Sequence, residues 1–76
     1  MEWKNIKIPE GAKLYKVHNY TYMHKGVIYH LEVDEFQDGT FVGHGEHSSD
    51  KSNVLESVSG NSVLHCLEIL VNKIKK

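Results

Sequence analysis

The chain has no arginine, one cysteine, one proline and no long hydrophobic run. Without arginine it lacks the bidentate guanidinium fork that reads guanine and clamps phosphate. Its net charge of −1 gives no overall attraction to a polyanion. We therefore expect no duplex-DNA binding. No apolar stretch approaches the roughly 18 residues that a membrane helix needs, so we also expect no membrane association.

The single cysteine, Cys66, cannot form an internal disulfide. The first residues, 1–5, lack the charged and apolar regions of a secretory signal. Both features predict a protein of the reducing cytoplasm. With 76 residues, 39% apolar and 25% charged, the chain is typical of one small globular domain spanning residues 1–76.

Within this domain we expect a lead-in over 1–12, a sheet over 13–58 and a helix over 61–75. Val, Ile, Tyr, Thr and Phe dominate the predicted strands 14–23, 27–36 and 40–47, whereas 54–58 is either a fourth strand or an extended approach to the helix. The turn residues Pro9-Glu10-Gly11 close the lead-in. The fold class is α+β: two layers, with an antiparallel three- to four-stranded sheet, one C-terminal helix and one open sheet face.

The predicted helix has one apolar stripe and a polar start. Asn61 or Ser62 can cap its N-terminus. Gly43 and Gly45 would let the helix lie close to the middle of the sheet. The stripe consists of Val63, Leu67, Leu70, Val71 and Ile74, with Leu64, Cys66 and Ile69 widening it.

Two glycine-bearing breaks, His24-Lys25-Gly26 and Gln37-Asp38-Gly39, predict three-residue hairpin loops with glycine in the left-handed position. The first loop places Met23 opposite Val27, and the second places Val33 opposite Gly43. This register directs the odd-numbered residues of strand 27–36 toward the core. The predicted inward set is Val27, Tyr29, Leu31 and Val33.

The same register gathers aromatic, apolar and charged side chains on the open face, which is typical of an interaction surface. The alternative is that Tyr and Ile are there for strand propensity alone. We predict partner binding by His18, Tyr20, Tyr22, Ile28, His30, Glu32, Val42, His44 and Glu46. The partner is a protein or a second copy of the chain. Single-stranded RNA stacking on two of these tyrosines is the alternative, disfavoured by the nearby carboxylates.

No pattern indicates catalysis, a cofactor or a metal. His18, His30 and His44 could approach one ion, but no HxH or HExxH spacing accompanies them. In His44-Gly45-Glu46-His47 the two histidines point to opposite faces of a strand, and His47 is expected near Tyr29. Adjacent His65 and Cys66 diverge on a helix. We therefore predict a non-enzyme without cofactors, in which Cys66 fills the core.

Two stretches, 33–42 with its Asp38-Gly39 turn and 60–67 with its capped, leucine-spaced helix start, resemble the HicB-like antitoxin pattern. The resemblance covers about half of the chain. Its proline-glycine pair before the helix is replaced here by Ser59-Gly60. The resemblance implies a fold like part of a double-stranded-RNA-binding domain, and a toxin as protein partner. We accordingly expect a small non-catalytic interaction module, antitoxin- or inhibitor-like, that works through its open sheet face or a free edge.

Overall fold

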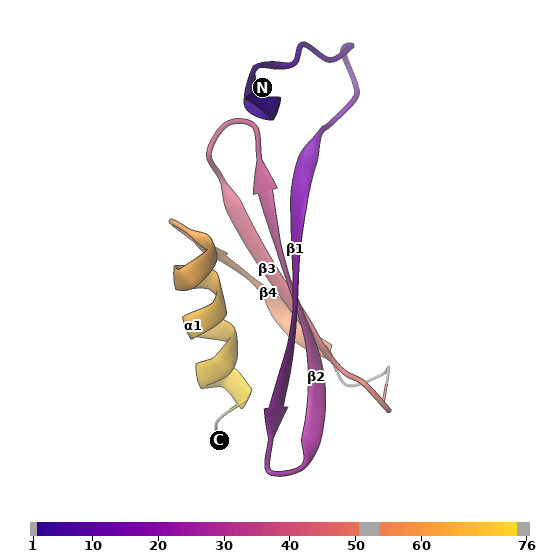
Figure 1. Ribbon diagram of the computed structural model, residues 1–76, viewed down its shortest axis with the longest axis vertical. Coiled ribbons are helices and arrows are strands. Elements are labelled where there is room, and N and C mark those ends of the chain that lie inside the picture. The colour runs from indigo at the N-terminus through magenta and orange to yellow at the C-terminus, as the bar shows by residue number, and fades with distance from the viewer. Residues whose placement is uncertain (1, 51–53, 75–76) are drawn as a thin grey trace.

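A computed structural model describes residues 2–50 and 54–74. An antiparallel sheet in the order β1-β2-β3-β4 is followed by one C-terminal helix, so the predicted α+β fold is confirmed (Figure 1). None of the helices in the described part of the chain has the length and apolarity needed to cross a membrane. The elements are the 3-10 helix η1 Trp3–Asn5, strands β1 Tyr15–His24, β2 Val27–Phe36, β3 Phe41–His47 and β4 Val54–Gly60, and helix α1 Val63–Ile74.

The β2–β3 hairpin has the predicted three-residue loop. Gly39 lies in the left-handed region at φ 91°, and the Phe36 amide donates to the Thr40 carbonyl at 2.9 Å. Val33 lies opposite Gly43, and Glu32 lies opposite His44. The register of this hairpin was therefore predicted correctly from its turn chemistry.

The β1–β2 hairpin differs from the prediction by one residue. His24 pairs with Val27, so the loop is only Lys25-Gly26, with both residues at positive φ (52° and 78°). These angles define a two-residue type I′ turn, whose twist matches the flanking strands. Because side chains alternate along a strand, a shift of one residue moves all of β1 to the other face. His18, Tyr20 and Tyr22 therefore lie on the helix side, and their predicted place on the open face is wrong.

Helix α1 begins where Ser62 caps it. The Ser62 hydroxyl accepts from the His65 amide at 3.0 Å, which confirms one of the two predicted caps. The helix packs on β2, β3 and β4, close to Gly43, where a Cβ would lie 3.3 Å from Cys66 Cβ. A Cβ at Gly45 would instead meet the strand side chains of Leu31 and Leu55, so Gly45 does not make room for the helix. The buried core consists of Leu31, Val33, Val58, Cys66, Leu70 and Ile74.

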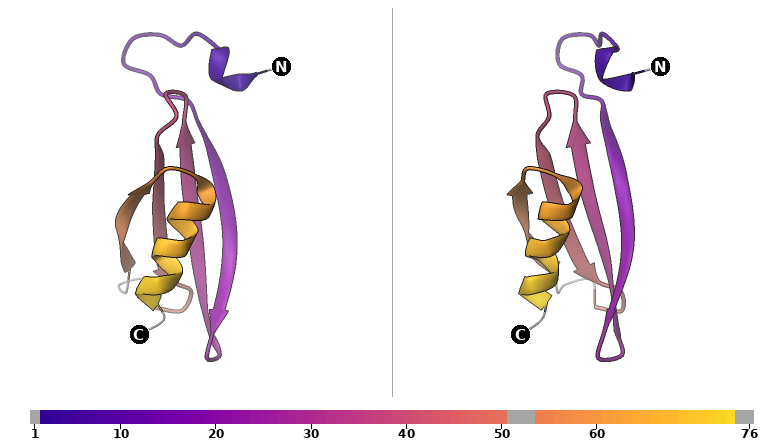
Figure 2. Two further views of the ribbon diagram at one scale, coloured as in Figure 1. Left: turned by 90° about the vertical axis from the view of Figure 1, so that its left-hand side faces the viewer. Right: turned by 60° about the vertical axis from the view of Figure 1, so that its left-hand side comes forward.

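Strand β1 contributes no residue to this buried core. Twelve helical residues span about 18 Å, whereas the ten residues of β1 or β2 span about 33 Å. The helix is therefore too short to cover the full length of the sheet. It lies over β2, β3 and β4 and leaves β1 uncovered, as the two side views show (Figure 2). The radius of gyration is 14.0 Å, against about 11 Å for a compact domain of this length. The sheet thus extends well beyond its core.

The lead-in folds over the β2–β3 loop at one end of the sheet (Figure 1). Lys4 Nζ lies 2.7 Å from Glu35 Oε2, and Gln37 Nε2 donates to the Ile6 carbonyl at 2.9 Å. The predicted turn is present, with the Ala12 amide donating to the Pro9 carbonyl. The lead-in is therefore held by side chains of β2 and of the loop that follows it.

Candidate functional site

The nine predicted partner-binding residues divide between the two faces of the sheet. Those on β2 and β3 share the open face as predicted, because the β2–β3 register is correct. Those on β1 lie on the helix side. The open-face group is Ile28, His30, Glu32, Val42, His44 and Glu46; the helix-side group is His18, Tyr20 and Tyr22.

The helix-side residues of β1 lie beside the core rather than within it. Tyr20 lies opposite Leu31 and is 41% exposed. Tyr22 lies opposite Tyr29, with ring centroids 6.5 Å apart. His18 Nε2 lies 3.0 Å from Glu35 Oε1, and this carboxylate also pairs with Lys4. The hydrogen bonds from Lys4 and His18 lower the pKa of Glu35.

The outer side of β1 is the free edge of the sheet. In a two-residue hairpin the closing pair, here His24 and Val27, is hydrogen-bonded, and hydrogen-bonded pairs then alternate along the ladder. The intervening residues of β1 consequently direct their N–H and C=O groups away from β2. This set, which we call the β1 edge, is Tyr15, Val17, Asn19, Thr21 and Met23.

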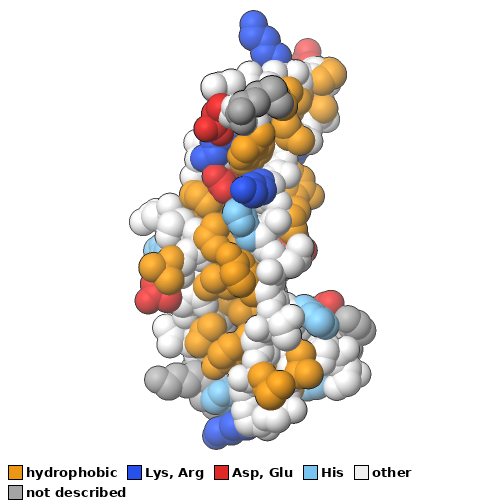
Figure 3. All heavy atoms as spheres, in the orientation of Figure 1, with side chains coloured by type: hydrophobic (Ala, Val, Ile, Leu, Met, Phe, Trp, Pro, Cys, Tyr) orange, Lys and Arg blue, Asp and Glu red, His pale blue; other side chains and the backbone are white. Residues whose placement is uncertain are grey.

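Hydrophobic side chains accompany the β1 edge. They form a band along the molecule in the view that looks onto β1 (Figure 3). Met23 at the hairpin end is 64% exposed, and Ile28 opposite it is also exposed. The other exposed members on β1 are Tyr15, Val17 and Tyr20. Exposed apolar side chains gathered along one strand are typical of interaction sites.

The fixed charges on β1 itself and on its turn have one sign. No aspartate or glutamate occurs between Gly11 and Leu31. Lys13 precedes β1, Lys16 lies within it and Lys25 forms its turn. The carboxylates begin at Glu32, on β2. β1 and its turn therefore carry only positive fixed charge, although Glu32 and Asp34 of β2 lie opposite Asn19 and Val17.

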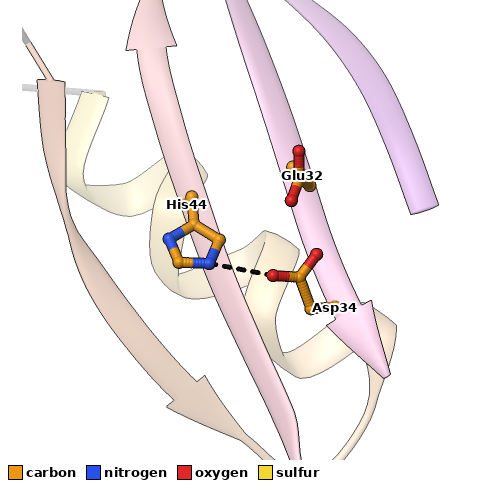
Figure 4. A group of neighbouring side chains, drawn as sticks. All are labelled: Glu32, Asp34 and His44. Atoms are coloured by element: carbon orange, nitrogen blue, oxygen red, sulfur yellow. Dashed lines mark hydrogen bonds and ion pairs between the residues drawn. The ribbon is translucent and has the colours of Figure 1, made fainter. Parts of the chain in front are cut away.

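A second cluster lies on the open face of β2 and β3, where Glu32, Asp34 and His44 converge (Figure 4). One ligand atom from each lies within 4.8 Å of the other two. His44 Nε2 donates to Asp34 Oδ2 at 3.0 Å. On the other side of the ring, the Ser57 hydroxyl donates to His44 Nδ1 at 3.0 Å. The imidazole is thus oriented from both of its nitrogens.

Asp34 is the buried member of this cluster. It is only 7% exposed, and its Oδ1 has no hydrogen-bond donor. Its carboxylate lies next to Glu32, and this contact, followed by desolvation, raises the pKa of Glu32. Two carboxylates therefore approach each other where one of them is shielded from water. Among the ion pairs of the described residues, His44 is the partner of Asp34, and no lysine pairs with Glu32 or Asp34.

The structure separates the three histidines considered from sequence as metal ligands. His18 lies on the helix side, whereas His30 and His44 lie on the open face. The predicted register of strand 27–36 directs its even-numbered residues, Asp34 among them, to the open face, but the predicted site includes neither Asp34 nor Ser57. The alternation of Glu32 and Asp34 on one strand face was the available signal. The place of Ser57 depends on a β-bulge in β4, which no local pattern announces.

The other reactive side chains have structural partners. Cys66 is fully buried in the core, as expected, and this burial raises the pKa of its thiol. His65 Nδ1 accepts from the Asn61 amide at the helix start. His47 contacts Tyr29 at a ring-centroid distance of 5.5 Å, also as expected, and accepts from the Ser49 amide.

Comparison of the chain with protein-family models, with curated proteins and with solved structures finds no match. The resemblance to HicB-like antitoxins therefore stays a prediction. The β1 edge and the Glu32–Asp34–His44 cluster carry what can be inferred about function.

Proposed function

We propose that the protein is a small, non-catalytic interaction module of the cytoplasm whose β1 edge pairs with an extended segment of a protein partner. The supporting observation is that β1 is a long and regular edge strand. It runs for ten residues without proline, and its ladder with β2 has no register shift. Proteins usually blunt free edges with short strands, proline, bulges or several charges, because bare edges pair with other chains.

The other edge, β4, is blunted in this way. It is seven residues long, and its pairing with β3 shifts register between Gly43 and Gly45. A bulge increases local twist and disrupts the regular ladder. Strand addition is therefore favoured at β1, where main-chain hydrogen bonds supply affinity and alternate side chains supply specificity.

The lysines on and beside β1 indicate the chemistry of the partner. Lys13, Lys16 and Lys25 favour a segment with acidic side chains, and the exposed Val17 and Met23 favour apolar ones between them. Antiparallel pairing of β1 with a second copy would instead bring cationic strands together. An acidic, partly apolar strand of another protein, such as the toxin implied by the HicB-like resemblance, fits better.

A proline substitution on the β1 edge tests this proposal. Thr21 directs its N–H outward, so Thr21→Pro removes one donor for the added strand and leaves the β1–β2 ladder intact. Thr21→Ala is the matched control, because it changes the side chain and keeps the N–H. We expect Thr21→Pro to weaken partner binding at least tenfold and Thr21→Ala to leave it within about twofold, since a lost hydrogen bond and a misfitted strand cost about 1.5 kcal/mol or more.

Affinity capture identifies the partner to be purified for this measurement. Wild type and both variants are used as bait in parallel. In the purified complex the amides of Val17, Asn19, Thr21 and Met23 should gain protection from hydrogen exchange. A partner that binds Thr21→Pro as tightly as wild type would contradict strand addition. A wild-type dimer that Thr21→Pro converts to a monomer would replace the acidic partner with a second copy.

Single-stranded RNA binding is a second candidate, because the structure weakens the objection to it. Tyr20 and Tyr22 lie on the face opposite to Glu32 and Glu46, so these carboxylates are not beside a base stacked on the tyrosines. A salt titration with a generic oligonucleotide tests it. RNA binding requires at least micromolar affinity at low salt that falls as salt rises, and weakening by Tyr20→Ala. Absence of binding at low salt would discard this candidate.

A further inference from the structure

We propose that Glu32, Asp34 and His44 bind one transition-metal dication on the open face of the sheet, with zinc as the best-fitting ion. This site lies on β2 and β3, opposite Val17 and Asn19 of the β1 edge, and the proposal does not rest on strand addition at that edge. The proposal stands on two observations: the convergence of three ligand atoms within 4.8 Å, and the nine-tenths burial of an Asp34 carboxylate whose Oδ1 has no donor.

The donor spacing is close to that of a coordination sphere. Ligand atoms that are each 2.0–2.1 Å from a tetrahedral zinc lie about 3.3 Å apart. His44 Nε2 and Asp34 Oδ2 are 3.0 Å apart. Glu32 is partly exposed and can turn its carboxylate inward to complete the set. Only small side-chain movements are needed, because all three residues lie on two adjacent strands (Figure 4).

The electrostatics of the cluster call for a cation. A buried carboxylate oxygen without a donor is costly, and a second carboxylate beside it adds repulsion. A dication would satisfy Asp34 Oδ1 and neutralise the pair. The competing explanation is a proton shared between Glu32 and Asp34 with His44 as the counter-charge. The two explanations differ in whether added metal stabilises the protein.

Ser57 supplies the outer support that metal-bound histidines usually have. If Nε2 of His44 binds the metal, Nδ1 carries the proton and donates to the Ser57 hydroxyl, so the present contact is kept with its direction reversed. An imidazole with two carboxylates suits zinc or manganese better than calcium, which prefers oxygen alone. Three protein ligands leave the fourth zinc position for solvent.

The test uses Co²⁺ as a spectroscopic probe and Zn²⁺ as its competitor, on the purified full chain. We expect one Co²⁺ per chain, with visible absorption that Zn²⁺ abolishes. Free Zn²⁺ at one hundred times its Kd should raise the Tm by about 10–20 °C. His44→Gln and Asp34→Asn should weaken binding at least about 100-fold, and Ser57→Ala about tenfold.

Matched variants separate a metal site from a structural cluster. His30→Gln removes another imidazole from the same face and should leave the affinity within about twofold. Asp34→Asn should have a Tm without metal at least equal to that of wild type, because it removes the carboxylate repulsion, and should show no rise with Zn²⁺. If Asp34→Asn does not fold, Glu32→Gln, at a partly exposed position, provides the same comparison.

Three results would overturn the proposal. The first is no Zn²⁺ binding below millimolar concentration, which would favour the shared proton. The second is binding that His44→Gln and Asp34→Asn leave unchanged, which would place the ion at other histidines. The third is equal loss in His30→Gln and His44→Gln, which would exclude this set of three ligands.

Discussion

His24 lies directly opposite Val27 at the end of the β1–β2 ladder, so only Lys25 and Gly26 form the loop. This single pairing decides the face on which every side chain of β1 lies. It places Tyr20 opposite Leu31, beside the core, and leaves Asn19 and Thr21 on the open face. The turn is therefore the most informative place to perturb the hairpin.

Lys25→Asn should stabilise the protein. Lys25 has φ 52°, which is unfavourable for a residue with a long side chain, whereas Asn tolerates this region and Asn-Gly is the preferred type I′ pair. We expect a gain of about 0.5–1 kcal/mol in the free energy of unfolding, measured by chemical denaturation. Lys25→Ala controls for the lost charge and should show no gain. A variant Lys25→Asn no more stable than Lys25→Ala would argue against the two-residue turn.

Gly43→Ala should cost more than Gly45→Ala, although the second glycine has the closer neighbours. A Cβ at Gly43 would lie 3.1–3.3 Å from Val58, Leu70 and Cys66, in the fully packed contact between helix and sheet. We expect a loss of about 1–3 kcal/mol from overpacking.

At Gly45 the nearest atoms are methyl groups of Leu55, at 2.7 Å, and Leu31, at 3.0 Å. Leu55 is only partly buried and can change rotamer, so we expect a loss of about 1 kcal/mol or less. Urea denaturation of both variants gives the comparison. The reverse order would mean that the helix does not rest on Gly43.

Asp38 should titrate at a lower pH than an ordinary aspartate. The Thr40 hydroxyl and the Thr40 amide, at 2.9 Å, donate to its carboxylate and lower its pKa. Because the folded-state pKa is lowered, the resulting stability is present above the unfolded pKa of about 3.9 and is lost as pH falls through the folded value. Carboxyl NMR titration measures this shift.

Thr40→Val removes the hydroxyl, keeps the amide donor and should raise the Asp38 pKa part of the way back. Thr40→Ser retains the hydroxyl and should preserve the low value. An Asp38 pKa that is the same in Thr40→Val and wild type would show that the hydroxyl does not contact the carboxylate.

Gln37→Glu should release the lead-in from the end of the sheet. The Gln37 amide nitrogen donates to the Ile6 carbonyl at 2.9 Å and to the Trp3 carbonyl at 3.4 Å. A glutamate of the same shape has no donor at neutral pH, and its charge repels both carbonyls. Tryptic cleavage after Lys7 should become several-fold faster, because proteases select locally released segments. Cleavage after Lys73, at the other end of the chain, serves as internal control. Unchanged cleavage after Lys7 would mean that other contacts hold the lead-in.

Sequence patterns were enough to predict the first three strands, the C-terminal helix with two candidate caps, and the β2–β3 register. These depend on local signals: Gly39 in a left-handed position, Ser62 at a helix start, and apolar residues at helical spacing. The Gln37-Asp38-Gly39 loop could be predicted because the alternative register would have put His44 and Glu46 on the apolar side. In this hairpin the turn residues and the alternation of apolar and polar side chains predict the same register, and such agreement makes a prediction secure.

The faces of β1 follow from packing and not from its sequence pattern. Both alternations along β1 contain apolar and polar residues, so its pattern favours neither register, and a lysine at positive φ is a rare choice for a turn. Side-chain contacts settle it: Tyr22 packs on Tyr29 across the hairpin, and His18 reaches Glu35, which Lys4 also binds. The same holds for the open-face cluster, because Ser57 reaches His44 only through a bulge in β4. Packing against a partner that lies far along the chain cannot be inferred from a strand whose two faces look alike.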